Sequence, residues 1–259
     1  MDLGISGRNA LVCGASAGLG YACANALAHE GVAVTITGRD VVKLEAAADR
    51  LRAETGAKIT IAAGDITTEE GRAAALAVCP APDILVTNAG GPPSGDFRQF
   101  TDVQWQAALN ANMLTPIALI RAVVDGMVAR RFGRIVNITS AAVKAPMQGL
   151  TLSNTARTGL TGFVAGVSRE VAWANVIINN ILPGPFDTGR LRRNLSPGPE
   201  IDNQAAERGM AAWAARIPAR RVGNPAEFGA ACAFLCSAHA GFIVGQNILL
   251  DGGEFNSTM

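Results

Sequence analysis

The chain has 259 residues, of which 49% are hydrophobic, and its 22 Lys and Arg residues almost balance 21 Asp and Glu residues, for a net charge of +1. This length provides a core that needs neither disulfides nor a structural metal, in one large α/β domain or two small ones. The near-neutral charge excludes the clustered cations with which nucleic-acid-binding proteins neutralise phosphates, so no nucleic-acid partner is expected.

The cysteines indicate neither a disulfide framework nor a zinc site, because they are odd in number and include no Cys-x-x-Cys pair. They are Cys13, Cys23, Cys79, Cys232 and Cys236. We interpret them as small buried side chains in a reducing compartment, and we expect no metal. No long uncharged apolar run and no cationic segment before an apolar stretch is present. We therefore expect a cytoplasmic protein without a membrane partner.

In chain order, short apolar runs alternate with longer helical patterns, which is the order that builds a parallel sheet with helices on both faces. The predicted strands are Asn9–Cys13, Val32–Thr37, Lys58–Ala62, Ile84–Thr87, Arg134–Thr139, Val176–Leu182 and Asn247–Leu250. The predicted helices include Leu19–His29, Val41–Thr55, Val103–Arg130, Thr151–Ala174 and Pro225–Cys236. Gly31, Gly56 and Gly133 are the predicted helix ends, where a positive φ is favoured. We predict one α/β domain over residues 1–259, with a doubly wound sheet of seven strands.

The segment from Pro183 to Pro225 interrupts this regular alternation and is rich in Pro, Gly and Arg. A connection of that length within a compact domain is usually functional, often as a lid. We predict a substrate loop over about residues 184–225; the alternative is a disordered excursion.

A glycine-rich turn, Gly14-Ala15-Ser16-Ala17-Gly18-Leu19-Gly20, follows the first strand and opens the first helix. Glycines let the backbone approach a pyrophosphate, whose charge is met by N–H groups and the positive end of the helix. The alternative is a turn that is merely tight. Asn88-Ala89-Gly90-Gly91 and Pro183-Gly184 end the fourth and sixth strands at the edge where open α/β sheets bind ligands.

With these motifs at consistent spacing, the chain resembles the short-chain dehydrogenase/reductase family, and its layout is similar to that of the 3-oxoacyl-[acyl carrier protein] reductases. The resemblance runs from the glycine motif to Asp251-Gly252-Gly253. It implies a Rossmann-like fold that binds a nicotinamide nucleotide. By this resemblance, the pyrophosphate side is held by Gly14, Ser16, Gly18, Leu19 and Gly20. The adenine is flanked by Asp65 and Ile66, and the adenosine ribose packs against Asn88, Ala89 and Gly90. In the segment that starts Pro183-Gly184, Thr188 bonds the nicotinamide carboxamide.

The second strand ends in Thr37-Gly38-Arg39-Asp40, which bears on the choice of nucleotide. An acidic side chain here accepts from a ribose 2′-hydroxyl, whereas an Arg suits a 2′-phosphate. Gly38 matches the position that carries Asp in NAD-dependent relatives, and Arg39 follows it, so NADP is expected rather than NAD. The alternative is a solvated Arg39 beside Asp40 as a helix N-cap.

Ordinary family members use an Asn, a Ser and a Tyr-x-x-x-Lys pair on one helical face. Asn112 and Ser140 match the Asn and the Ser, but Ser153 and Arg157 stand where the Tyr and the Lys are expected. No Tyr-x-x-x-Lys exists anywhere in the chain, because its single tyrosine is Tyr21.

This departure changes the chemistry that the site can perform. A serine hydroxyl is shorter than a phenol and far less acidic than the phenol's pKa of about 10. Arg157 can still donate to ribose hydroxyls, but it stays protonated and cannot relay a proton. Other candidate donors are Lys144, Asp187, or a water held by Ser140, Ser153 and Asn112. Asp187 is more simply a helix cap, and Lys144 a solvated residue.

His29 and His239 are expected at the surface, away from the site. Six residues of the predicted substrate loop have two possible roles: they border an anionic or acyl substrate, or they belong to a helix with an exposed cationic face. They are Arg190, Arg192 and Arg193, with Phe186, Met210 and Trp213.

Three functions remain open on this sequence. The first is an NADP(H)-dependent carbonyl reductase or alcohol dehydrogenase with a non-standard proton donor, acting on a small molecule. The second is a nucleotide-binding protein without redox turnover, and the third is an addition or elimination enzyme. A homotetramer is expected if the small residues Gly159, Gly162, Ala165 and Gly166 allow close helix approach between chains; they could instead pack on the chain's own sheet.

Overall fold

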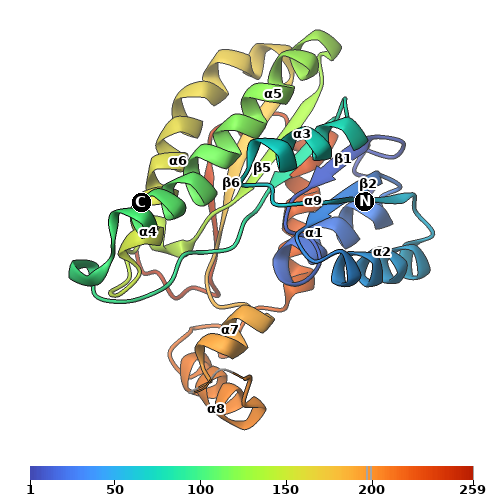
Figure 1. Cartoon of the computed structure of the whole chain (residues 1–259). Coiled ribbons are helices and arrows are strands. Elements are labelled where there is room, and N and C mark those ends of the chain that lie inside the picture. Colours follow the sequence, from blue (N-terminus) through green and yellow to red (C-terminus); the bar gives the residue numbers. More distant parts are fainter. Residues whose placement is uncertain (197, 199, 259) are drawn as a thin grey trace.

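Seven parallel strands form one sheet at the centre of the molecule (Figure 1), which a computed structural model describes for residues 1–196, 198 and 200–258. They are β1 (Asn9–Val12), β2 (Ala33–Gly38), β3 (Ile59–Ala63), β4 (Ile84–Thr87), β5 (Gly133–Ile138), β6 (Val176–Pro183) and β7 (Asn247–Leu250). The order β3-β2-β1-β4-β5-β6-β7 reverses between β1 and β4. The predicted doubly wound, Rossmann-like class is therefore confirmed, and the crevice at this reversal is where such sheets bind ligands.

Helices cover both faces of the sheet, which explains why consecutive residues of the central strands are buried rather than alternating between buried and exposed. One face is covered by α1 (Gly18–His29), α2 (Val41–Thr55) and α9 (Pro225–Cys236). The other is covered by α3 (Glu69–Val78), α5 (Thr115–Arg130) and α6 (Thr151–Val171). Neighbouring strand residues point to opposite cores: Val12 packs with the first set of helices and Leu11 with the second.

The observed boundaries differ from the predicted ones in two informative places. Helix α3 is not among the predicted helices; it is short, and Ala75 is the one residue in it that is buried. Gly133 was wrongly taken as a helix end. It begins β5, and Arg131 takes the left-handed conformation at the end of α5, with φ 53°. Glycine suits position 133 because a Cβ there would lie 2.6 Å from the Met127 sulfur.

The long helix predicted at 103–130 is divided by a π-helical turn. Helix α4 (Asp102–Leu109) is followed by the turn Asn110–Leu114 and then by α5. Such turns insert one residue into a helix and are frequent at functional sites. Here the turn contains Asn112, whose side chain is 4% exposed.

The same stretch, Asp102–Arg130, is long and apolar enough in composition to cross a bilayer, with a mean hydropathy of 1.4 and 39% of its most apolar window buried. Core helices of soluble proteins share these properties. In this fold Leu119, Ile120, Val123 and Met127 of α5 are buried against the sheet.

The segment predicted as a substrate loop contains two helices, α7 (Gly189–Asn194) and α8 (Asn203–Ala214), which project away from the sheet at the bottom of Figure 1. Positions 197 and 199 of this segment lie outside the described residues. Arg192 ties the segment together, because its guanidinium lies 2.6 Å from Asp187 and 2.9 Å from Glu207. The described part of the segment thus contains two helices joined by irregular stretches.

All five cysteines are buried and free, as expected. Burial raises the pKa of the Cys13 thiol to about 12, so this side chain is neutral and unreactive at physiological pH.

Candidate active site

The glycine loop between β1 and α1 has the backbone geometry of an anion cradle. Gly14 and Gly18 have φ of 57° and 62°, in the region that favours glycine. No side chain caps α1, since its N-cap residue is Ala17 and its first turn carries no acidic residue. The first N–H groups of this helix are therefore available to a ligand.

Close packing holds this loop in place. The Asn88 side chain donates from Nδ2 to the Gly14 carbonyl at 3.1 Å, which connects the end of β4 to the loop. A Cβ on Gly20 would lie 2.3 Å from the Gly14 oxygen, so only glycine fits there. Free N–H donors at a helix N-terminus beside such a turn fit a diphosphate group.

At the far end of the crevice, the residues assigned to the adenosine also lie near each other. Ser16 packs against Gly38 at the end of β2. Arg39 is exposed, and its charge helps to lower the pKa of Asp65, which is lowered mainly by the hydrogen bond from the Thr67 N–H. Ile66 beside it is 7% exposed. An exposed Arg39 next to this crevice suits a 2′-phosphate.

The neighbouring Asp40 caps α2 by accepting from the Lys43 N–H at 3.1 Å. Its predicted role as an N-cap is therefore confirmed.

Asn112 and Ser140 lie at the carboxyl edge of β4 and β5. Asn112 donates from Nδ2 to the Gly90 carbonyl at 3.4 Å and to the Ala108 carbonyl at 3.3 Å, while its Oδ1 makes no hydrogen bond to the described residues. Ser140 follows β5, and its Oγ accepts from the Ala142 N–H at 3.1 Å. The Ser140 hydroxyl hydrogen and the Asn112 oxygen are thus left for a ligand or a water.

Ser153 and Arg157 share one face of α6, one turn apart, and are in direct contact. Arg157 donates from Nε to Ser153 Oγ at 3.2 Å and from Nη1 to the Ile138 carbonyl at 2.8 Å. Because Ile138 ends β5 and Ser140 follows it, Arg157 links the helix to the strand that carries Ser140. Burial, together with the nearby Arg190 charge, lowers the pKa of Arg157 to about 10, so it remains a cation at neutral pH.

Pro183, Gly184 and Thr188 continue from β6 to α7. Gly184 donates to the Leu250 carbonyl at 2.9 Å. Thr188 is the N-cap of α7, accepting from the Leu191 N–H at 3.2 Å, and its methyl group lies against Gly18. Thr188 therefore lies beside the start of α1, next to the glycine loop.

Asp187 does not cap α7, contrary to expectation, because the Thr188 hydroxyl reaches the first-turn N–H groups. The Asp187 carboxylate instead forms two hydrogen bonds with Arg192, at 2.6 and 2.7 Å.

The other candidate proton donors lie elsewhere or in solvent. Tyr21 donates to Glu54 on the outer side of α1, at 3.1 Å. His29 and His239 are exposed, as expected, and Lys144 is exposed beside the turn that follows Ser140.

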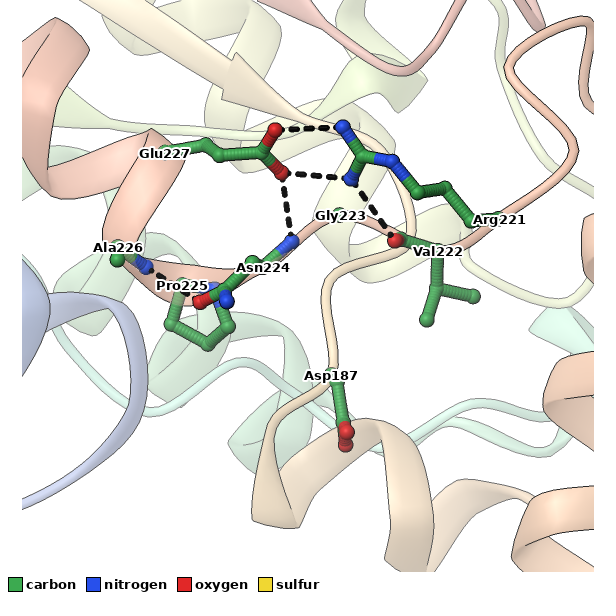
Figure 2. Close-up of a pocket in the computed structure, with 8 residues that line it drawn as sticks. All are labelled: Asp187, Arg221, Val222, Gly223, Asn224, Pro225, Ala226 and Glu227. Atoms are coloured by element: carbon green, nitrogen blue, oxygen red, sulfur yellow. Dashed lines mark hydrogen bonds and ion pairs between the residues drawn. The ribbon is translucent and has the colours of Figure 1, made fainter.

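A surface hollow of about 520 Å³ lies where the α7–α8 segment returns to α9 (Figure 2). Arg221 and Glu227 on its rim neutralise each other, with hydrogen bonds of 2.7 and 2.5 Å, and Figure 2 shows Asp187 pointing away from this pair. Its lining includes none of Asn112, Ser140, Ser153 and Arg157. We therefore place the candidate active site at the crevice and not in this hollow.

Arg190 is the residue whose position the sequence did not indicate. It reaches from α7 across to the segment after β4, donating to the carbonyls of Gly91 at 3.0 Å and Pro92 at 3.2 Å. The contact joins residues 99 positions apart, so no local pattern could reveal it.

Comparison with known proteins identifies the family. Residues 14–254 match the family model described as "Enoyl-(Acyl carrier protein) reductase". The chain is 32% identical to the 3-oxoacyl-[acyl-carrier-protein] reductase of Vibrio harveyi over 255 residues, covering 98% of this chain and 99% of that protein. The chain belongs to the short-chain dehydrogenase/reductase family.

Solved structures of this family match the whole fold. The L-sorbose reductase from Gluconobacter frateurii, solved with NADPH and L-sorbose, has a TM-score of 0.93 and 29% identity, covering 99% of this chain and 100% of that one. A 3-oxoacyl-(acyl-carrier-protein) reductase from Agrobacterium tumefaciens with NADP bound has a TM-score of 0.87 and 28% identity, covering 97% and 96%. The sequence of this short-chain dehydrogenase/reductase contains no Tyr-x-x-x-Lys segment.

Proposed function

We propose that this chain is an NADP(H)-dependent oxidoreductase that reduces a carbonyl or oxidises an alcohol in a small molecule, with a non-standard proton donor. The observation that carries the proposal is the contact between Arg157 and Ser153, which keeps a cation and a hydroxyl one helical turn apart beside the strand end that bears Ser140. NADPH-bound relatives with the same fold support the choice of nucleotide.

The residues present fit NADP at both ends. The uncapped start of α1, with Gly14, Gly18, Leu19 and Gly20, would hold the diphosphate. Arg39 would pair with the 2′-phosphate. The nicotinamide end would lie toward Thr188 and Arg157. When bound, the nucleotide supplies or accepts the hydride.

The protein's own groups would then polarise the substrate oxygen. Ser153 Oγ accepts a hydrogen bond from Arg157, which leaves the serine hydrogen free to donate to that oxygen. Ser140 is in the same state, because its Oγ accepts from a backbone N–H. The fixed Arg157 charge stabilises negative charge that develops on the oxygen.

The proton itself comes from water in this proposal. A serine hydroxyl is a weak acid, and Arg157 stays protonated across the physiological range. A water held by the free Asn112 Oδ1, beside Ser140 and Ser153, would pass a proton to the alkoxide, and the hydroxide that remains would take a proton from solvent water. We expect turnover to be slow, because losing a positioned general acid typically costs about 10²- to 10⁴-fold in rate.

We further propose that residues 184–225 act as the substrate loop of a single-domain, cytoplasmic homotetramer. The projection of α7 and α8 from the carboxyl edge of the sheet supports the first part. Exposed small residues on α6 support the second.

The absence of a phenol and an ammonium favours one competing function, nucleotide binding without redox turnover. Calorimetry with NADPH and NADH, followed by NADPH oxidation over a broad carbonyl panel, separates the two. We expect NADPH to bind more tightly than NADH, Arg39→Ala to remove that preference, and Lys58→Ala, a charge change outside the crevice, to keep it. NADPH binding without oxidation would leave only the binding function, and failure to bind either nucleotide would reject both.

A matched pair of variants tests the active-site assignment. We expect Ser153→Tyr with Arg157→Lys to raise the rate on simple 3-oxoacyl esters, since it restores a phenol and an ammonium. The single change Ser153→Tyr, without a Lys to lower the phenol's pKa, should raise it less. Unchanged activity in the double variant would show that these positions do not face the substrate.

A further inference from the structure

Two arginines, Arg157 and Arg190, reach the carboxyl ends of the neighbouring strands β5 and β4 near the candidate active site, and neither has a carboxylate partner among the described residues. None of the ion pairs among the described residues includes Arg157 or Arg190. The hydrogen-bond acceptors of both are uncharged. They are Ser153 Oγ and the Ile138 carbonyl for Arg157, and the Gly91 and Pro92 carbonyls for Arg190. Arg157 Nη2 makes no hydrogen bond to any described residue.

The two positive charges also act on each other. The charge of Arg190 contributes, after burial, to the lowered pKa of Arg157, and burial lowers the pKa of Arg190 itself. Arg157 is only partly exposed, and holding its charge near the second, exposed cation Arg190 without an anion is unfavourable. A bound anion would reverse this, because the guanidinium fork matches a carboxylate or phosphate through paired hydrogen bonds.

The neighbouring arginine shows that the chain has paired its cations selectively. Arg192, on the same helix as Arg190, takes the carboxylates of both Asp187 and Glu207. Arg190 points instead across to the segment after β4, on the side of Arg157. Asp187, which precedes α7, and Glu207 on α8 therefore neutralise Arg192, and neither pairs with Arg157 or Arg190.

The position of the pair favours a substrate over the nucleotide as the source of the anion. Arg157 contacts Ser153, so a group bound to Arg157 lies next to the hydroxyl assigned to the substrate oxygen. The diphosphate has its own donors at the start of α1, where Thr188 lies against Gly18.

We propose that Arg157 and Arg190 together bind the carboxylate of an oxo-acid or hydroxy-acid substrate, with Arg190 closing over it from the α7–α8 segment. This inference rests on the proposed function, since it names the substrate class of that same site.

Matched pairs of ligands that differ only in charge test the proposal. Pyruvate, acetoacetate and levulinate place a carboxylate at increasing distance from a ketone, and the methyl ester of each is its neutral control. Binding to the NADP⁺-saturated protein is measured by calorimetry, so that no turnover is needed. We expect at least one acid to bind about 10- to 100-fold more tightly than its ester, the range of one charge-assisted contact.

Variants then assign the preference to the pair. Arg190→Met and Arg157→Met should each bring acid and ester to similar affinity, and Arg190→Lys should retain part of the preference. Arg193→Met removes an exposed charge from the same helix and should keep it. Circular dichroism of each variant checks that it is folded.

Two results would overturn the inference. One is that no acid binds better than its ester in the wild-type protein. The other is that Arg190→Met weakens NADPH binding and affects acid and ester alike, which would make the nucleotide's phosphates the anion. Direct NADPH calorimetry on the wild type keeps this distinct from failure of the proposed function, in which the nucleotide itself would not bind.

Discussion

Arg157 illustrates how strongly a single residue can be constrained by its surroundings. It occupies a helix position where the side chain must lie against β5, and its hydrogen bonds to Ser153 and Ile138 fix it there. The residue type was evident in the sequence, but its burial and the effect of the Arg190 charge on it were not, because both depend on segments far apart in the chain.

Replacing this arginine should stabilise the fold while impairing function. Burial lowers the pKa of Arg157 from 12.5 to about 10. Since the unfolded chain holds the proton more tightly, burial costs stability at every pH below about 10, and the cost fades as pH rises from there toward 12.5. We expect Arg157→Met to raise the free energy of unfolding by about 1–2 kcal/mol across neutral pH. Urea unfolding at several pH values between about 6 and 9 measures it.

Arg193→Met is the control, because this arginine is exposed and its removal should change stability little. A lower stability for Arg157→Met over that whole range would show that its hydrogen bonds outweigh the cost of the buried charge.

At the scale of elements, the sequence predicts whether a segment is a helix or a strand better than it predicts a break within a helix. The bounds predicted for α2 and α9 match the observed ones: α2 buries Leu44, Ala47, Ala48 and Leu51, and α9 is an apolar run that begins at Pro225 after the N-cap Asn224. The π-helical turn at Asn110–Leu114 escaped notice, since inserting one residue leaves the helical pattern on each side intact. Yet this turn decides where Asn112 points.

The start of α1 provides a prediction about an element. A Cβ on Gly20 would lie 2.3 Å from the Gly14 oxygen, which must move to accept it. We therefore expect Gly20→Ala to destabilise the protein by about 2 kcal/mol and to weaken NADPH binding at least tenfold. Thermal unfolding and calorimetry measure the two effects.

Gly126→Ala is the matched helical control. It lies exposed on α5, and the added Cβ would meet only the movable end of Arg130, at 3.2 Å. This change should stabilise the protein by about 0.5–1 kcal/mol and leave NADPH binding unchanged. Equal effects of the two substitutions would contradict a packed glycine loop.

At the scale of the whole molecule, one of the small residues on α6 packs within its own chain, whereas the others face outward. A Cβ on Gly159 would meet the Met113 sulfur at 2.5 Å, so this glycine packs within its own chain. Gly162, Ala165 and Gly166 are exposed, and nothing lies within 4 Å of a Cβ on either glycine. Leu114, at the start of the same helical layer, is 49% exposed. These outward positions suit close approach of a second chain.

We expect a homotetramer in solution and its dissociation in Gly166→Arg, because a long charged side chain would separate the paired helices. Light scattering coupled to size-exclusion chromatography measures the mass, and NADPH calorimetry on the variant checks that the crevice is intact. A wild-type monomer would refute the assembly.

The sequence by itself determined the order of strands and helices, the glycine loop and the loss of the Tyr-x-x-x-Lys pair, because these depend on residue type and on periodicity over a few residues. It also placed Ser153 and Arg157 one turn apart, since a helix repeats at that spacing. Only the tertiary structure decided that Arg157 reaches Ile138, that Arg190 crosses to Gly91 and Pro92, and that Arg192 takes the nearby carboxylates. Charge and burial at the site arise from contacts between segments far apart in the chain, and no local pattern encodes such contacts.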